Sequence, residues 1–260
     1  GVNMVFLYWN DNMTWLKDTI DDYLWGTENL DLADFDNDGN IDVVAEAYYA
    51  DVVAVYMNSG EDPIKWTKEV LDNSLNGATF VIAEDMNGDG AKDVVSCGLM
   101  SGEVVWYENN LPDKWSKHVI STRAQGRNIV NVADINKDNK PDVIIPIRNH
   151  QEIVLFINNL PDPVWTEIII DGDINGAYVV QCNDVDIDGD MDIIASLEEN
   201  STNIDLVWYE NQGLDKVWIK HDISTELTSA FALFEMDFNK DGFVDFVVTD
   251  GLQGLAYGPH

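Results

Sequence analysis

The amino-acid sequence predicts an all-β protein, built as a β-propeller of four-stranded blades. Three observations support this prediction. A nine-residue acidic loop recurs five times, β-branched and aromatic runs recur in register around each copy, and no segment of useful length has helical periodicity. Four short strands in each repeat of about 50 residues are typical of a propeller blade. We therefore expect residues 1–260 to form a single propeller domain of five repeats.

The acidic loops set the length of the repeat. They occupy residues 34–42, 85–93, 134–142, 184–192 and 237–245. Their first residues are about 50 positions apart, a period that indicates a repeat architecture. Within each loop the acidic residues alternate with other residues, so the loops are not simple runs of negative charge.

The strands are predicted from the segments around each loop. A β-branched run follows the loop, as at residues 43–44 and 193–194, and short β-rich runs bounded by Gly, Pro, Asn or Asp favour strands. Next comes an aromatic strand that ends at Asn10, Asn58, Asn109, Asn158 or Asn211. The last strand opens at Trp15, Trp66, Trp115, Trp165 or Trp218. Because these Trp and Tyr residues recur in register, we interpret them as core between blades rather than as ligand contacts.

The number of blades follows from the residues outside the loops. Together the two ends of the chain make about one further repeat, so the sequence predicts five blades in a closed ring. In that ring the strand opened by Trp15 would complete the last blade. Residues 255–257 resemble a sixth aromatic strand, which leaves open the alternative that the chain is part of a six- or seven-bladed ring.

The residue types in the loops indicate a metal site. Loop positions 1, 3, 5 and 9 are always Asp or Asn, and position 7 varies freely, as expected if it binds through its backbone carbonyl. Such hard oxygen ligands suit Ca²⁺, which takes six to eight of them. The expected ligands are Asp34, Asp36, Asp38, Asn40 and Asp42; Asp85, Asn87, Asp89, Ala91 and Asp93; Asp134, Asn136, Asp138, Lys140 and Asp142; Asp184, Asp186, Asp188, Asp190 and Asp192; and Asp237, Asn239, Asp241, Phe243 and Asp245. We expect about five Ca²⁺ ions, one in each repeat.

Other loop positions support this interpretation. Position 6 is Gly in four loops and Asn139 in the third, the residue types that tolerate a left-handed turn. Position 2 is always apolar and would anchor the loop to the core. An EF-hand is excluded because position 12 is never Glu and lies in a β-branched run.

With these loops, and with its Trp-Tyr-Glu-Asn and Trp-x-Lys-His segments, the chain resembles the VCBS/FG-GAP repeat family over nearly its whole length. The resemblance implies a calcium-binding β-propeller like those of integrin α-subunits and fungal propeller lectins. It also implies an extracellular or cell-surface location. Functions in the family include adhesion, glycan binding and, in some polysaccharide lyases, catalysis, and the fold alone selects none of them.

Charge and composition exclude some classes of partner. The formal net charge is −34, so the chain would repel nucleic acid, whose binding depends on cationic side chains, and anionic membranes. No apolar run is long enough to span a membrane.

We expect Cys97 and Cys182 to be buried free thiols because they lie in different repeats. Asn12 and Asn200 begin glycosylation sequons, which would be used only in a eukaryotic source.

The expected partner is a glycan or an extracellular protein surface. In a four-stranded blade the acidic loops lie on one face, so the loops of the opposite face are free to vary and to bind a ligand. Exposed aromatic rings with planar polar groups suit sugar recognition. The candidate ligand residues are Trp25, Tyr48, Tyr49, Arg127, Arg148 and His150.

Two alternatives remain at this point. The chain could be a structural module of a larger surface or filament protein. It could instead be a polysaccharide lyase, because its three arginines, Arg123, Arg127 and Arg148, and His150 lie in the third repeat. No catalytic signature accompanies them, so we expect no enzyme.

Overall fold

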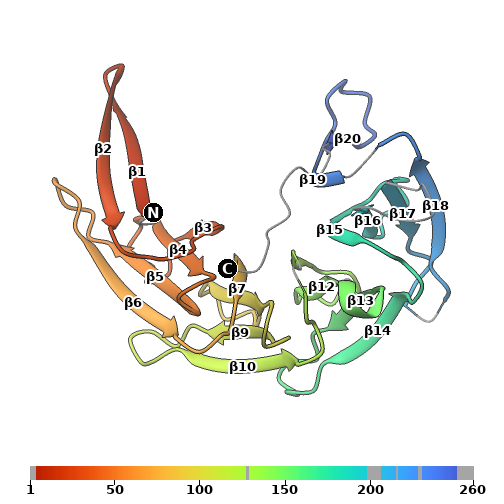
Figure 1. Ribbon diagram of the computed structural model, residues 1–260, viewed down its shortest axis with the longest axis horizontal. Coiled ribbons are helices and arrows are strands. Elements are labelled where there is room, and N and C mark those ends of the chain that lie inside the picture. Colours follow the sequence, from red (N-terminus) through yellow and green to blue (C-terminus); the bar gives the residue numbers. More distant parts are fainter. Residues whose placement is uncertain (1–3, 127–128, 198–205, 215, 228–229, 251–260) are drawn as a thin grey trace. The chain divides into compact units, whose positions relative to one another are not determined.

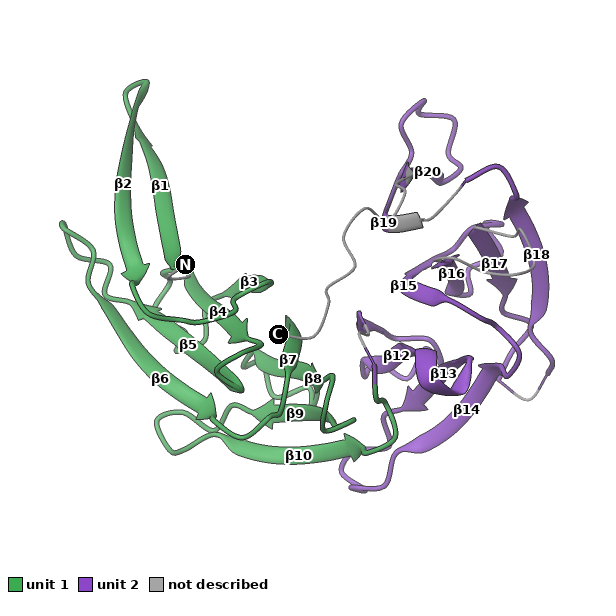
Figure 2. Ribbon diagram, in the orientation of Figure 1, with its two compact units in different colours: residues 1–125 green, residues 126–260 purple. Residues whose placement is uncertain are grey.

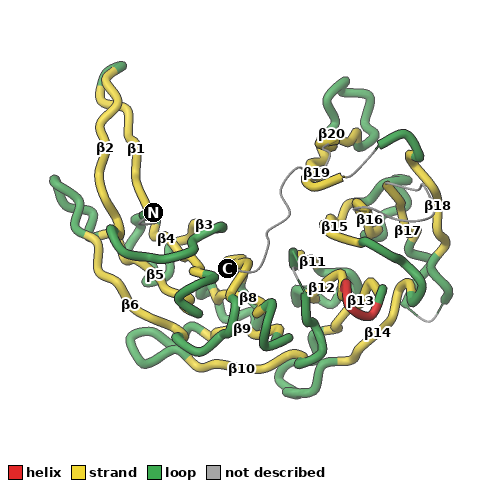
Figure 3. The backbone as a smooth tube through the Cα atoms, viewed as in Figure 1, coloured by secondary structure: helices red, strands yellow, loops and turns green. Residues whose placement is uncertain are grey.

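The computed structural model describes residues 4–126, 129–197, 206–214, 216–227 and 230–250. Within these ranges the chain forms twenty β-strands and one short 3₁₀ turn, η1 (Arg148–His150) (Figures 1 and 3). The all-β prediction is confirmed. No helix among the described residues is of the length and hydrophobicity that crossing a membrane requires.

Sixteen of the strands form four antiparallel sheets of four strands each, and each sheet is one blade. The first blade is β3 (Leu30–Ala33), β4 (Asp42–Ala47), β5 (Val52–Asn58) and β6 (Trp66–Asp72); the second is β7 (Ala78–Glu84), β8 (Asp93–Gly98), β9 (Val104–Glu108) and β10 (Ser116–Ser121); the third is β11 (Asn131–Ala133), β12 (Asp142–Ile147), β13 (Glu152–Ile157) and β14 (Thr166–Asp171); the fourth is β15 (Ala177–Asn183), β16 (Asp192–Leu197), β17 (Leu206–Glu210) and β18 (Ile219–Ser224). Two further sheets have two strands each. They are the N-terminal hairpin, β1 (Val5–Asp11) and β2 (Thr14–Asp21), and the C-terminal hairpin, β19 (Ala230–Met236) and β20 (Asp245–Asp250).

The chain divides into two compact units (Figure 2). Unit 1, residues 1–125, contains the N-terminal hairpin and the first and second blades. Unit 2, residues 126–260, contains the third and fourth blades and the C-terminal hairpin. By their place in the repeat, β1 and β2 are the third and fourth strands of a blade, and β19 and β20 are the first and second strands.

Burial explains the composition of the strands. Every residue of β4, β8, β12 and β16 is buried, and these second strands are the β-branched runs that follow the acidic loops. Strands covered on both faces are expected to be continuously apolar. The fourth strands, such as β6 and β14, alternate between exposed and half-buried residues, as expected for strands with one solvated face.

The core lies between neighbouring blades of each unit. In unit 1, Phe35 and Val55 of the first blade pack with Val94 and Tyr107 of the second blade. In unit 2, Leu155 of the third blade packs with residues of the fourth blade that include Tyr209 and Trp218. Side chains of successive blades therefore interdigitate, which is how a propeller buries its sheet faces.

This arrangement confirms the β-propeller of four-stranded blades, and four complete sheets with two hairpins fit a count of about five. The in-register Tyr56, Tyr107 and Tyr209 are buried core residues, as predicted. Trp15 departs from the prediction because it is 67% exposed; its hairpin has no inner strands within unit 1 to cover it. The single five-repeat domain, and the completion of the last blade by the Trp15 strand, stay predictions.

Neither cysteine forms a disulfide bond with a described residue, as expected. Cys97 is buried and Cys182 is half-buried. Burial raises the pKa of the Cys97 thiol to about 12, so this side chain behaves as a small apolar core residue rather than as a nucleophile.

Candidate functional site

All five acidic loops have the same internal hydrogen bonds. The carboxylate at position 1 accepts the backbone N–H of position 6, as Asp34 Oδ2 does from Gly39 at 2.9 Å. The side-chain oxygen at position 3 accepts the N–H of position 5, and position 5 accepts the N–H of position 7. The same bonds form in the other four loops. The backbone thus orients the side-chain oxygens of positions 1, 3 and 5 around a common centre.

Position 9 fastens the loop to the blade. The buried Asp42 accepts the N–H of Phe35, at position 2, with one oxygen and the N–H of Asn58, at the end of β5, with the other. Asp93, Asp142 and Asp192 repeat both bonds. The Asn that ends each third strand is therefore the residue that joins the loop to the sheet, a role that the sequence did not reveal.

Two positions of each loop have a left-handed backbone. The sequence predicts a left-handed backbone at position 6, and the φ angles of Gly39 and Asn139 there are 90° and 66°. The sequence does not predict this backbone at position 4, yet Asn37, Lys137 and Ile187 have φ angles of 57°, 61° and 64°. A β-branched residue such as Ile187 is a genuine outlier in this region, and such strain concentrates at functional sites.

Carboxylates crowd most closely in the first and fourth loops. Asp34, Asp36 and Asp42 each place one oxygen within 4.8 Å of the others, and so do Asp184, Asp186 and Asp188. The second, third and fifth loops have Asn at position 3, so an amide oxygen replaces one carboxylate there. All five loops offer an oxygen-only ligand set, which fits a hard divalent cation.

The carboxylate at position 9 has a raised pKa in four of the loops, mainly because it is buried. Burial, with a smaller contribution from the carboxylates of Asp89 and Asp85, raises the pKa of Asp93 to about 7 against the hydrogen bonds from Asn109 and Met86. Burial likewise raises the pKa of Asp142 to about 6, and the pKa values of Asp42 and Asp192 are also raised, mainly by burial. The loops therefore hold negative charge that a cation would stabilise.

The loops of the opposite face gather three of the six expected ligand residues. Trp25 stacks on Tyr49 with ring centres 5.1 Å apart and an interplanar angle of 27°. Tyr48 meets Tyr49 edge-on, at 4.9 Å and 80°. Trp25 and Tyr49 are 53% and 57% exposed. We call Trp25, Tyr48 and Tyr49 the aromatic corner.

A glycine allows this corner to form. Gly26 has a φ of 93°, and a Cβ atom there would lie 2.6 Å from the backbone nitrogen of Tyr49. The N–H of Tyr48 donates a 3.0 Å hydrogen bond to the Gly26 carbonyl. The β2–β3 and β4–β5 connections are therefore fastened together at the place where the rings stack.

The other three expected ligand residues belong to residues 126–260, which are unit 2. Arg148 and His150 lie in η1 of unit 2. The Arg148 guanidinium lies over the Tyr178 ring at 5.6 Å, and His150 faces Glu152 at 3.8 Å. Arg127 lies outside the described residues.

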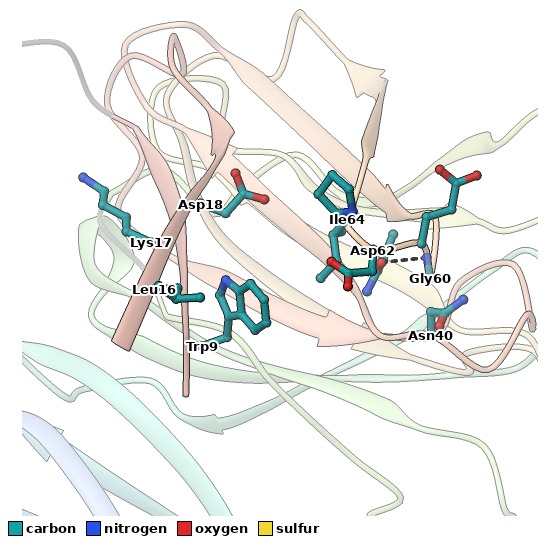
Figure 4. A pocket seen from close by; sticks show the side chains of 11 residues that line it. Trp9, Leu16, Lys17, Asp18, Asn40, Gly60, Asp62 and Ile64 are labelled. Carbon is teal, nitrogen blue, oxygen red and sulfur yellow. Dashed lines mark hydrogen bonds between the residues drawn. The ribbon is translucent and has the colours of Figure 1, made fainter. Parts of the chain in front are cut away.

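A cleft of about 610 Å³ lies on the acidic-loop side of unit 1. Its walls are the N-terminal hairpin, with Trp9 and Leu16, and the first blade, with Asn40 and Asp62 (Figure 4). At the next junction Phe35 packs on Trp115 with ring centres 5.8 Å apart. The cleft therefore lies at the junction between the N-terminal hairpin and the first blade.

Comparison with known proteins identifies the repeats. The family model described as FG-GAP-like repeat matches residues 85–145 and 184–248, just under half of the chain. Both stretches begin at position 1 of an acidic loop. Together they include the complete second, third, fourth and fifth loops. These two stretches of the chain are FG-GAP-like repeats. No curated protein matches it closely enough to be a relative.

Among solved structures, this chain is similar to a lectin of Agrocybe aegerita, which is described as specifically recognising non-reducing terminal N-acetylglucosamine. The TM-score is 0.65 at 16% sequence identity, and the similarity covers 95% of this chain and 69% of the lectin chain. At this identity the similarity concerns the fold.

The structure also contains a recurring triad that the sequence analysis does not predict. Asp21 Oδ2 accepts hydrogen bonds from the Tyr56 hydroxyl at 2.7 Å and from Lys68 Nζ at 2.6 Å. The same triad recurs as Asp72, Tyr107 and Lys117, and as Asp171, Tyr209 and Lys220. Each Asp ends the fourth strand of one sheet, and its partners lie on the third and fourth strands of the next, so the triad joins successive blades.

Hydrogen bonds dominate the charge state of these aspartates. Burial alone would raise the pKa of Asp72, but hydrogen bonds from Lys117, Ser74 and Tyr107 outweigh it and hold the pKa below its ordinary value. The pKa values of Asp21 and Asp171 are lowered against burial in the same way. The recurrence of Asp, Tyr and Lys at fixed repeat positions was the available signal.

Proposed function

We propose that this protein is a calcium-stabilised extracellular binding module that recognises a glycan, or a protein surface, through the face opposite its acidic loops. The observation that carries the proposal is the aromatic corner of Trp25, Tyr48 and Tyr49. The exposed rings of Trp25 and Tyr49 stack, the half-buried Tyr48 meets Tyr49 edge-on, and Gly26 holds the two connections together. The FG-GAP-like repeats and the lectin-like fold point to a non-enzymatic binding module.

Calcium is proposed as the structural cofactor. FG-GAP repeats are generally calcium-binding, and the oxygen-only loops with raised pKa values at Asp93 and Asp142 support a cation in each loop. We propose about five ions, one in each loop, with the ligand residues expected from the sequence. The millimolar calcium outside cells suits modules with weak sites, which supports the proposed extracellular location.

The aromatic corner supports glycan binding for a physical reason. Tyr and Trp present a large apolar face together with a hydroxyl or N–H that can hydrogen-bond. A pyranose ring has matching C–H faces and peripheral hydroxyls. Because the protein carries a formal charge of −34, we propose an uncharged glycan rather than an acidic polysaccharide, and this also argues against the lyase alternative. The Agrocybe aegerita lectin makes terminal N-acetylglucosamine a reasonable first probe.

Calcium binding is tested by thermal melting and by metal analysis. Each occupied site adds about 2.7 kcal/mol to the free energy of unfolding when free calcium is 100-fold above its dissociation constant. We expect a chelator to lower the melting temperature strongly, and protein dialysed against millimolar calcium to hold about five ions per chain. Equal melting temperatures with and without chelator would contradict the proposal.

Glycan binding is tested with a glycan array in millimolar calcium. We expect hits among neutral glycans, lost on Trp25→Ala. Trp15→Ala is the matched control, because Trp15 is also exposed but lies on the N-terminal hairpin, outside the aromatic corner. An array without hits, or equal loss of binding in both variants, would argue against glycan recognition at the corner.

A further inference from the structure

A second cleft lies in unit 1, where the chain leaves the N-terminal hairpin. It has a volume of about 590 Å³, within the range of small-molecule sites. Its walls come from the end of β2, the start of the β2–β3 connection, and the first blade. They are Thr19, Ile20, Asp21, Asp22, Tyr23, Tyr56 and Lys68.

The floor of this cleft is a preformed polar group. Asp21, whose side chain is only 9% exposed, accepts hydrogen bonds from Lys68 Nζ, the Tyr56 hydroxyl and the Tyr23 N–H. Lys68 is 37% exposed, and its ammonium group has three donors, one of which goes to Asp21. The floor thus combines a fixed donor with an acceptor, and the exposed Asp22 adds a second carboxylate.

The wall of the cleft is the ring of Tyr23, which is 74% exposed. The equivalent turns of two other blade junctions show that the fold does not need this ring. Ser74 donates its N–H to Asp72 at 2.7 Å, and Asp173 donates its N–H to Asp171 at 2.9 Å. Tyr23 makes the same backbone bond to Asp21 at 2.7 Å. Ser74 adds a bond from its hydroxyl group, but at Asp173 and Tyr23 the backbone N–H makes the bond of the turn. The Tyr23 ring is therefore not needed for this turn and is available for another role.

The lysine of this junction also differs. At the next junction Lys117 is held by two carboxylates, Asp72 at 2.8 Å and Glu103 at 3.0 Å. Lys68 forms its ion pair with Asp21 at 2.6 Å, and the residue of β5 that corresponds to Glu103 is the apolar Val52. Donor groups of Lys68 therefore face the cleft without a second carboxylate from the neighbouring strand.

We propose that this cleft is a second saccharide subsite, which takes one uncharged pyranose ring. The proposal rests on the glycan-binding function proposed above and adds a site outside the aromatic corner. The Tyr23 ring stacks on a C–H face of the sugar, Lys68 donates to a hydroxyl oxygen, and Asp22 accepts from a hydroxyl group. Asp21 already balances the charge of Lys68, so the remaining negative charge of Asp22 disfavours acidic sugars.

The test is a titration of the full chain, in millimolar calcium, with the methyl β-glycosides of glucose, galactose and N-acetylglucosamine. Ring-labelled tyrosines followed by NMR report on Tyr23 directly. We expect one glycoside to shift the Tyr23 ring signals, and Tyr23→Ser to weaken the binding that these signals report by about tenfold or more, the loss expected for a stacked aromatic contact. The melting temperature should not fall, because Ser74 shows that serine satisfies the same turn through its N–H and its hydroxyl group.

Ser74→Tyr is the matched control. It places the same ring at the equivalent turn, where Glu103 also holds the lysine, and it should add no saccharide site. If Trp25→Ala abolishes all glycoside binding while the Tyr23 signals do not move and Tyr23→Ser binds normally, the cleft proposal is wrong and the corner stands. If no glycoside binds to the wild-type chain, the glycan function itself fails.

Discussion

The Tyr107 hydroxyl donates a 3.0 Å hydrogen bond to Asp72 Oδ2, across the junction between the second and first blades. Both side chains are buried. A β-bulge makes the bond possible: Val53 pairs with Asp72 but Ala54 pairs with Val70, so Leu71 is an extra residue on β6. Bulges redirect the side chains that follow them, and here the redirected side chain reaches the next blade.

The first prediction concerns this hydroxyl group. Tyr107→Phe should lower the free energy of unfolding by roughly 1–2 kcal/mol, because it removes one buried hydrogen bond and leaves Asp72 with its bonds from Lys117 and Ser74. Urea denaturation measures the change. Tyr8→Phe is the control, because Tyr8 has the equivalent place on β1 but is 57% exposed. Removing its hydroxyl group should change the free energy of unfolding by a negligible amount. Equal effects of the two substitutions would contradict a buried triad.

The second prediction is the pH dependence of the same triad. The pKa of folded Asp72 is lower than that of an unfolded aspartate, which is about 3.9. Its stabilisation is therefore fully present above about pH 4 and is lost as the pH falls through the folded pKa. We expect the stability difference between wild type and Asp72→Asn to be roughly 1–3 kcal/mol near pH 6 and to shrink below pH 4. Denaturation curves from pH 2 to 6 test this; a constant difference would contradict it.

The repeat and its loops could be predicted from the sequence because their information is local. An acidic loop needs oxygen-bearing residues at positions 1, 3, 5 and 9 and a permissive residue at position 6, and these are read within nine residues. The second strands could also be predicted, since burial on both faces requires continuous apolar runs such as that of β12.

The triads and the aromatic corner could not be predicted in the same way. Asp72 and Tyr107 are far apart in the sequence, and the tyrosine was interpreted only as apolar core. The Trp25–Tyr49 contact depends on two connections that meet at Gly26, which no local pattern indicates. Likewise, the left-handed backbone at position 4 was hidden because Lys137 and Ile187 are poor residues for it, and only the recurring loop hydrogen bonds impose it.

The third prediction concerns the Asn that ends a third strand. The buried Asn109 side chain donates to the Phe35 carbonyl of the first blade at 2.7 Å and to the Lys92 carbonyl at 3.0 Å. Asn109→Ala would leave both carbonyl groups without these donors and should cost roughly 2–4 kcal/mol. The side chain of the neighbouring Asn110 donates to the Glu108 carbonyl and the Ser116 hydroxyl at a half-buried site, so Asn110→Ala should cost less than about 1 kcal/mol. Thermal or urea unfolding of the two variants gives the comparison, and a larger effect of Asn110→Ala would contradict the role of Asn109.

The fourth prediction concerns strain in the fourth acidic loop. Ile187 has a φ of 64° and is 53% exposed, so its side chain gains little from burial while its backbone is unfavourable for a β-branched residue. Asn tolerates this conformation and stands at the same position of the first loop as Asn37, with a φ of 57°. We expect Ile187→Asn to raise the free energy of unfolding by about 1 kcal/mol and Asn37→Ile to lower it by a similar amount. Both changes should be the same with and without calcium, provided that the loop keeps this backbone in both states. An unchanged or lower stability of Ile187→Asn in calcium-free urea denaturation would show that the left-handed backbone at position 4 stores no strain.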